Sequence, residues 1–265
     1  MKWRFVFIII IFVLQTFVHV GYASIEEDTE GLDKLADQSL QFAKVERREE
    51  AEKLLLLFSD RFMQLATEGH PYSMDEINII TVAEEEALKA LRNEEKTTDE
   101  VVNELTRFRL AVDAIHNGKY PLWTGMKNSL MTSISQTKSA IEKQDSVAFQ
   151  KELNHFLSLY NILYPAIKVD VTPERFQSVD AHVKYIDQYR PQVFSDQSKR
   201  KEFNKLEGQL KDMFNEMEED DTDPSLWWVI ISTGSIIIMT LSYVGWKKFK
   251  GNREKVLTKK KNTNI

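Results

Sequence analysis

Residues 97–118 read TTDEVVNELTRFRLAVDAIHNG, and the spacing of their apolar side chains decides the fold class. An apolar residue recurs every three or four positions, which is the spacing of one face of an α-helix. The threonines at the start are favoured N-caps, and Asn117-Gly118 is a common helix end. The stretch therefore predicts one amphipathic helix, whose inward face comprises Val101, Leu105, Phe108, Val112 and Ile115.

The same spacing continues on both sides and predicts that residues 24–215 are helical. Upstream, a long helix or a broken pair ends at Gly69-His70-Pro71, and a capping box of Ser73 and Glu76 opens the next helix. Residues 167–171 alternate like a strand, but one short strand cannot form a sheet. Downstream we expect a helix after Pro121, one from about Asp145 to Tyr164, one with Thr172 as cap and Pro173 in its first turn, and one after Pro191.

The predicted fold class is all-α: an exported bundle of about six or seven helices followed by one C-terminal transmembrane helix. A solenoid of stacked helix pairs is the alternative to a bundle. The transmembrane helix is residues 226–246, which carry no charge and span about 31 Å, the thickness of a bilayer core. Aromatic residues mark both interfaces, and lysines place the tail, residues 247–265, in the cytoplasm. The interface residues are Trp227, Trp228, Tyr243 and Trp246, and the first anchoring charges are Lys247, Lys248 and Lys250.

Residues 1–23 have the layout of a signal peptide, with two basic residues, an apolar run and small residues before a cleavage point after Ala23. An uncleaved signal anchor is the alternative, because the apolar run is long for a signal peptide. Both interpretations predict that residues 24–215 are exported. Residues 216–225 form an acidic juxtamembrane spacer, which is typical of a solvated segment; loose binding of a divalent cation is the alternative.

Charge and motif content exclude several classes of function. The net charge is −6 and the tail is basic, so the exported part is acidic and offers no patch for nucleic acid. The chain has no cysteine, which excludes thiol catalysis and thiolate metal sites. Phosphate-loop, dinucleotide, zinc-protease and nucleophile-elbow motifs are missing, and Glu84-Glu85-Glu86 is typical of a solvated helix face. We therefore expect no catalytic residues and no enzymatic activity.

Two carboxylate-x-x-His pairs have the spacing that helical di-metal sites use: Asp113 with His116, and Glu152 with His155. On a helical wheel, the apolar side chains of each helix lie within about 40° of the centre of its apolar face. Asp113 lies about 120° from that centre on its helix, and His155 lies about −120° from the centre on the other helix. A metal site inside the bundle needs all four side chains turned inward. We therefore expect solvated helix faces here, with no bound metal or cofactor.

Aromatic residues gather with prolines at two expected helix junctions. Tyr120 and Trp123 flank Pro121, while Tyr160 and Tyr164 precede Pro165. Large amphipathic rings are common anchors at protein interfaces, so these four residues are candidates for binding a partner. The alternative is that they fill the core at the junctions, as buried aromatic residues ordinarily do.

Residues 164–176, which read YPAIKVDVTPERF, together with the signal peptide and the anchor, resemble the sporulation protein YpjB family of Bacillus and related endospore formers. The resemblance covers nearly the whole chain and rests on layout rather than on a catalytic signature. It implies a membrane protein connected with sporulation. It supplies no active-site residues.

Two functions remain open. We expect a non-enzymatic, extracytoplasmic interaction or scaffold module on a single-pass anchor in the cell membrane, whose partners are the lipid bilayer and an envelope or membrane protein. The alternative is a sensor that binds a ligand or glycan, or a wall-active component, which signals through the anchor. An exposed apolar patch on a closed bundle favours the first, and a deep cleft with inward carboxylates favours the second.

Overall fold

The computed structural model describes residues 29–67, 72–117 and 121–219, and every regular element within these ranges is a helix. This confirms the all-α prediction for that part of the chain. The signal peptide, the transmembrane segment, the tail and the spacer beyond Glu219 lie outside the described residues. None of the described helices is long and apolar enough to cross a bilayer. The helical core belongs to the first of two compact units, Met1–Met217, and the second is Glu218–Ile265.

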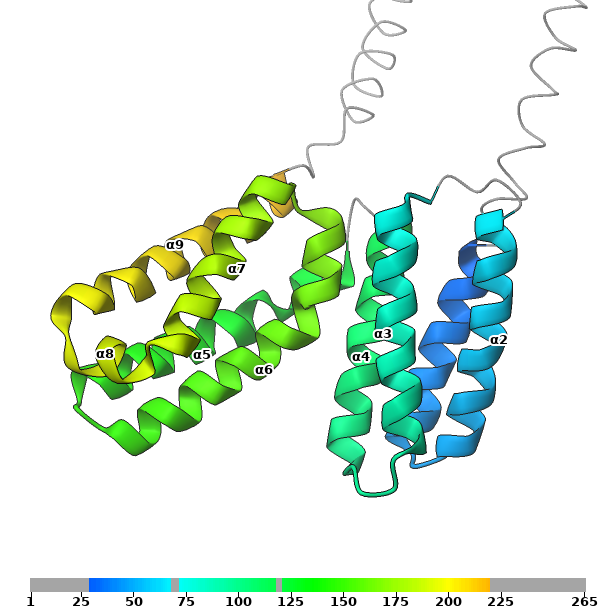
Figure 1. Ribbon diagram of the computed structural model, residues 1–265, viewed down its shortest axis with the longest axis horizontal. Helices are drawn as coiled ribbons and strands as arrows, with labels where there is room; N and C mark the ends of the chain where they lie inside the picture. The colour runs from blue at the N-terminus through cyan, green and yellow to red at the C-terminus, as the bar shows by residue number, and fades with distance from the viewer. Residues whose placement is uncertain (1–28, 68–71, 118–120, 220–265) are drawn as a thin grey trace, which may run out of the picture. The chain divides into compact units, whose positions relative to one another are not determined.

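Four helical stretches form the N-terminal half: residues 29–44, α2 (Arg48–Thr67), α3 (Met74–Arg92) and α4 (Thr98–His116) (Figure 1). Of the two expected alternatives for the first helical region, one long helix or a broken pair, the structure shows the broken pair. At the break Glu46 adopts a left-handed backbone with φ of 60°, and the Arg47 N–H donates to the Phe42 carbonyl over 2.9 Å. The predicted capping box of Ser73 and Glu76 is confirmed.

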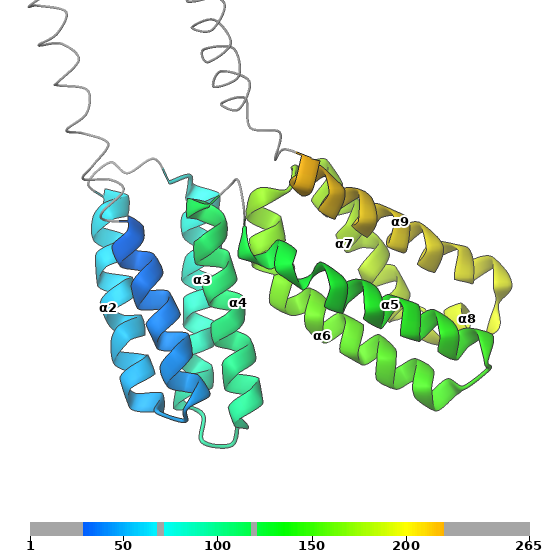
Figure 2. The same cartoon turned by 180° about the vertical axis from the view of Figure 1, so that it is seen from behind.

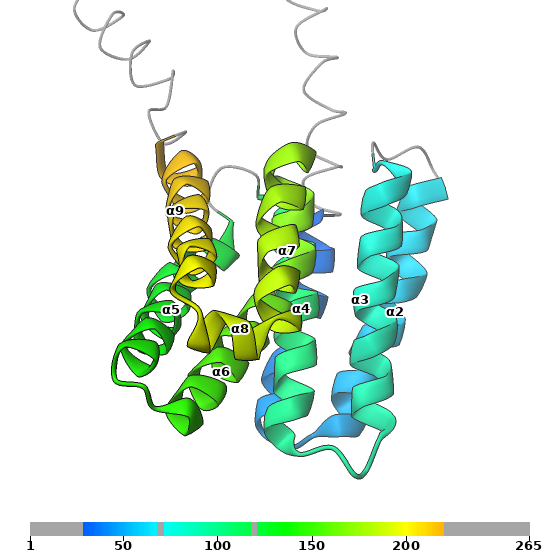
Figure 3. The same cartoon turned by 60° about the vertical axis from the view of Figure 1, so that its left-hand side comes forward.

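The C-terminal half consists of further helices and one 3-10 turn. Figure 2 shows α5 running alongside α6, and Figure 3 shows α8 linking α7 to α9. Pro173 occupies the first turn of α7, as predicted. The elements are η1 (Leu122–Met126), α5 (Lys127–Glu142), α6 (Ser146–Asp170), α7 (Pro173–Gln188), α8 (Arg190–Ser195) and α9 (Gln197–Glu219).

Helix α6 corrects two expectations. It does not end at Tyr164 but continues through Pro165 to Asp170, so the strand-like reading of residues 167–171 was wrong. Ala166 and Ile167 are fully buried and lie three and four positions after the buried Leu163. They therefore extend the apolar face of the helix, and this burial outweighs the hydrogen bond that a proline inside a helix removes.

Two hydrophobic cores meet at α4. Phe108 and Val112 belong to the core of the N-terminal half, while Leu110 and Ala114 belong to the core of the C-terminal half. Helix α4 thus packs against α3 on one side and along α6 on another (Figures 1 and 2). A helix buried on two sides has only one narrow face left for polar residues. That face and the neighbouring face of α6 form the groove described next.

Candidate functional site

An open groove of about 780 Å³ runs between α4, α6 and α7, with Arg190 of α8 at its end. Its volume falls in the range of known ligand sites, roughly 300 to 1,000 Å³, but its lining is polar rather than apolar. Asn154, Ser158 and Asn161 line the α6 wall. They lie at positions i, i+4 and i+7, so they form one polar stripe along the helix.

Glu104 is the centre of the α4 wall. Its carboxylate lies 3.8 Å from Nζ of Lys96 and 3.6 Å from a guanidinium nitrogen of Arg107. These are ion-pair distances, too long for hydrogen bonds. Oε2 of Glu104 and Nε of Arg107 are buried, and neither has a hydrogen-bond partner within the described residues. Because unpaired buried polar atoms are costly, this wall favours a polar, charged ligand beside it over an apolar one.

Asp180 is the residue of the α7 wall that contacts both Tyr160 and Lys184. It accepts a hydrogen bond from the Tyr160 hydroxyl over 3.4 Å and pairs with Nζ of Lys184 at 2.7 Å. Burial, together with the Asp180 charge, raises the pKa of Tyr160, and the hydrogen bond to Asp180 raises the pKa of Lys184. Both groups therefore stay protonated at neutral pH. Neither is suited to act as a base.

The groove carries both signs of charge in equal number. At the α8 end Arg190 donates to the Asn154 side-chain oxygen over 2.7 Å and pairs with Asp187. A lining with balanced charge disfavours a polyanion such as nucleic acid and suits a polar ligand that itself carries both signs. The cations are Lys96, Arg107, Lys184 and Arg190, and the carboxylates are Glu100, Glu104, Asp180 and Asp187.

The first of the two candidate metal pairs is buried, so its expected solvated position was wrong. The side chain of Asp113 is 2% exposed and that of His116 is 6% exposed. Asp113 accepts hydrogen bonds from the Leu122 N–H at 2.6 Å and from the Asn117 side chain at 2.8 Å. The cause is the second packing surface of α4, because a residue turned away from one core there meets the other half of the domain.

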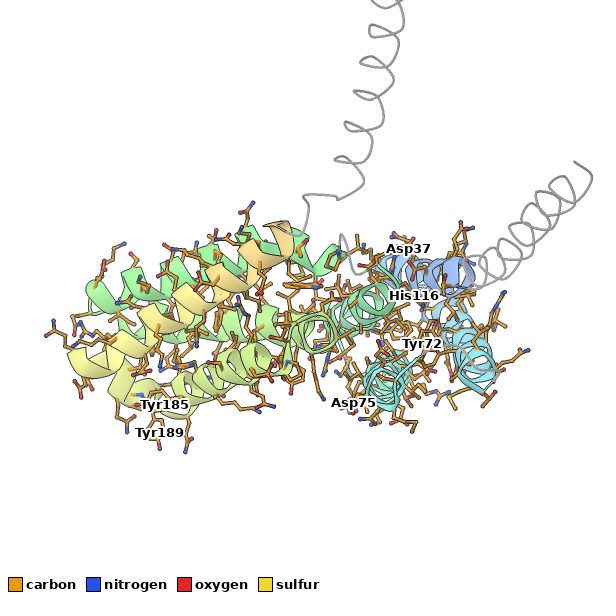
Figure 4. The ribbon with its side chains drawn as sticks, turned by 90° about the horizontal axis from the view of Figure 1, so that it is seen from above. Asp37, Tyr72, Asp75, His116, Tyr185 and Tyr189 are labelled. Carbon is orange, nitrogen blue, oxygen red and sulfur yellow. The ribbon has the colours of Figure 1, made fainter. Side chains whose placement is uncertain are left out.

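His116 lies in a polar network near the end of α4, where Figure 4 shows it with Tyr72 and Asp37, and Arg109 joins this network to Asp113 at 3.7 Å. Its Nδ1 lies 2.9 Å from Oδ1 of Asp33, and its Nε2 lies 2.9 Å from the Tyr72 hydroxyl. Arg109 lies 3.6 Å from Asp33. Both imidazole nitrogens of His116 are thus engaged by other side chains, and Asp113 serves different partners. The pair does not converge on a common point.

The second candidate metal pair and the glutamate run differ in their exposure to solvent. His155 is exposed and Glu152 half-buried, close to the solvated position expected of them. Within the described residues no group of three histidine or acidic side chains is placed to hold a metal ion. Glu84, by contrast, was wrongly expected to be solvated with its neighbours: it is 4% exposed, and burial raises its pKa against the opposing effect of a hydrogen bond with Ser59.

The aromatic candidates lie in different places. Trp123 is fully buried, with its ring 5.1 Å from that of Phe214, which matches the alternative in which these rings fill the core. Tyr160 is 2% exposed and Tyr164 half-buried, and both line the groove. Tyr120 lies outside the described residues, as do the four interface residues Trp227, Trp228, Tyr243 and Trp246 and the lysines Lys247, Lys248 and Lys250.

Comparison with protein families matches residues 29–258 to the family described as Sporulation protein YpjB. The chain belongs to this family. It is similar to the "Uncharacterized protein YpjB" of Bacillus subtilis (strain 168), with 32% identity over 230 residues that cover 86% of this chain and 87% of the relative. No solved structure matches the chain. The resemblance drawn from residues 164–176 is thus confirmed, and the protein is associated with sporulation.

Sequence reasoning missed the groove of this YpjB-family chain, although two signals point to it. On α4, Glu100, Glu104 and Arg107 form a stripe at i, i+4 and i+7. On α6 the matching stripe consists of Asn154, Ser158 and Asn161, small polar residues where an exposed helix usually carries long charged ones. Only the packing of α4 along α6 reveals that the two stripes border one groove.

Proposed function

We propose that this protein is a membrane-anchored, extracytoplasmic interaction module of sporulation, with no catalytic role, which holds a polar peptide segment of an envelope or membrane protein in the groove between α4, α6 and α7. The carrying observation is the mixed-charge lining of that groove, where Glu104 and Arg107 retain unpaired buried atoms. Peptide segments display both charge signs and backbone hydrogen-bonding groups, which such a lining can engage.

The chemistry of the groove supports binding rather than catalysis. The pKa shifts of Tyr160 and Lys184 are upward and keep both groups protonated, whereas a general base needs a pKa near the working pH. Each carboxylate on the α7 wall has a cation beside it, which suits a fixed recognition surface.

The two ends of the sequence support the proposed membrane anchor and the extracytoplasmic position of the helical part. The apolar segment 226–246 with its lysine-rich tail predicts a single-pass anchor, and the signal-like residues 1–23 predict export of the helical part. The groove would then face the extracytoplasmic space, where envelope proteins are available as partners.

A comparison of groove variants in sporulating cells tests this function. The full-length protein, tagged on its tail, is crosslinked and recovered from cells that carry the wild type, Asn161→Lys or Lys151→Glu. Asn161 is an exposed groove residue, whereas Lys151 is an exposed α6 residue outside the groove. We expect one envelope protein to accompany the wild type and Lys151→Glu but to fall at least fivefold with Asn161→Lys.

Two outcomes would contradict the proposal. Equal recovery of the partner with both variants would place the docking surface elsewhere. If no protein accompanies the wild type while the purified full-length chain retains a wall glycan, the sensor alternative is the better description.

A further inference from the structure

A second pocket, of about 360 Å³, lies between the end of α5 and the start of α9, apart from the groove. Lys138, Ile141 and Glu142 come from α5, at positions i, i+3 and i+4. Arg200, Phe203 and Asn204 come from α9 with a similar spacing. Each helix therefore presents one continuous stripe to the pocket.

The lining of this pocket is apolar in its deep part. Ile141 is 3% exposed and Phe203 is 1% exposed, and both belong to the core of the C-terminal half. They give this part of the lining an apolar character, which favours a ligand with an apolar portion over a wholly polar one.

Positive charge dominates the rest of the lining. Three cations, Lys138, Arg200 and Lys201, face one carboxylate, Glu142, although the protein as a whole is acidic. Lys138 pairs with Glu207, whose carboxylate lies 2.6 Å from its Nζ and also pairs with Lys211 at 2.8 Å. With Lys138 paired, Arg200 and Lys201 of α9 face Glu142, and two cations against one carboxylate leave one net positive charge in the lining.

Arg200 is held in place with one donor unused. Its guanidinium donates to the Phe194 carbonyl over 3.0 Å, which fixes the side chain. Its Nε is buried and has no hydrogen-bond partner among the residues that the structure describes. A charged group with a buried, unpaired donor is costly, and an anion beside the guanidinium lowers that cost through its charge. Lys201 is exposed and can close over such a group.

We infer that this pocket binds a small organic anion, a phosphate ester or carboxylate that carries an apolar group. The anionic head pairs with the guanidinium of Arg200 and with Lys201, and the apolar portion packs against the side of the pocket formed by Ile141 and Phe203. The volume suits a small molecule or the end of a lipid rather than a polymer. The same chemistry is present in a soluble metabolite and in an anionic lipid headgroup, which the experiment separates.

Equilibrium dialysis of the full-length protein in neutral detergent tests the inference with three probes: phenyl phosphate, inorganic phosphate and phenol. We expect saturable binding of one phenyl phosphate per chain, at least tenfold tighter than either fragment, because head and apolar group contribute together. Lys201→Gln should weaken binding about threefold to tenfold. Lys205→Gln, an exposed α9 residue that does not line the pocket, should leave it unchanged.

Arg200→Lys gives a second readout, since it keeps the charge and removes the planar guanidinium that the Phe194 carbonyl holds in place. It should lose at least tenfold in affinity for phenyl phosphate while its helical circular dichroism stays that of the wild type. Displacement of the probe by phosphatidylglycerol added to the micelles would identify a lipid headgroup as the ligand, and no displacement would identify a soluble anion. Absence of saturable binding, or equal weakening by Lys205→Gln and Lys201→Gln, would overturn the inference.

Discussion

The indole Nε1 of Trp123 donates a hydrogen bond to Oδ2 of Asp170 over 2.6 Å, joining η1 to the last residue of α6. On the neighbouring residue, the Leu122 N–H donates to Asp113 of α4 over 2.6 Å. Two carboxylates from two helices thus hold consecutive residues of the same short segment. This places like charges near each other at the junction between α4 and the C-terminal half.

The junction should make stability depend on pH. Burial raises the pKa of Asp170 to about 7, the Trp123 hydrogen bond opposes this shift, and the Asp113 charge adds to it. A raised carboxyl pKa contributes stability that is complete below the unfolded value and is lost as pH rises through the native one. Asp170→Asn cannot titrate. Between about pH 5 and about pH 8 the wild type should therefore lose on the order of 1 to 3 kcal/mol relative to this variant.

Thermal unfolding of both proteins across this range measures the effect. Parallel curves for the wild type and Asp170→Asn would show that the carboxyl group of Asp170 does not titrate differently in the native and unfolded states.

Glu84 offers a stabilising substitution. Its carboxyl group is buried in α3, and desolvation disfavours the charged form at neutral pH. Glu84→Gln keeps the shape and removes the charge, so the free energy of unfolding should rise by about 1 kcal/mol at pH 7. Glu85→Gln, at the exposed neighbouring position, should change it by less than about 0.5 kcal/mol. Urea denaturation compares the two, and a loss of stability in Glu84→Gln would contradict the expected charge penalty.

His116 should be important for stability. His116→Ala removes one hydrogen-bond partner of Asp33 and one of the Tyr72 hydroxyl, and it should cost about 2 to 3 kcal/mol because two hydrogen bonds of a largely buried network are lost. His155→Ala, on the exposed face of α6, is the matched control and should cost less than about 0.5 kcal/mol. Similar melting temperatures for the two variants would mean that the network contributes little.

The topology can be tested independently of the groove. A reporter enzyme fused after Ile265 should be active as a cytoplasmic fusion, and the same reporter inserted after Asp221 should be active only as an exported one. The reason is the excess of lysine after residue 246, which predicts that this side stays in the cytoplasm. An exported tail fusion would contradict the single-pass orientation.

Local signals in the sequence predicted much of the fold. The capping box at Ser73 and the proline in the first turn at Pro173 depend on neighbouring residues alone, so their positions were predictable. Glu84 could also have been placed, because it shares a stripe with Ile80 and Ala87 at i, i+4 and i+7. Its expected exposure came from treating three glutamates as one run.

The burial of Asp113 and the groove could not be predicted in the same way. Asp113 is buried because α4 packs against both halves of the domain, and a helical wheel contains no information on a second neighbour. Likewise, Glu104 and Asn161 border one groove only because α4 and α6, far apart in sequence, lie side by side.

Site-specific photocrosslinking in sporulating cells is the most direct test of the docking groove. A photoreactive residue replaces Asn161 inside the groove or Lys151 outside it, in the full-length protein. The proposed function predicts a crosslink to one envelope or membrane protein from position 161, at least fivefold stronger than from position 151, and its loss when Lys184→Glu is introduced in the same chain. Equal crosslinking from both positions, or a crosslink from position 161 that Lys184→Glu leaves unchanged, would contradict it.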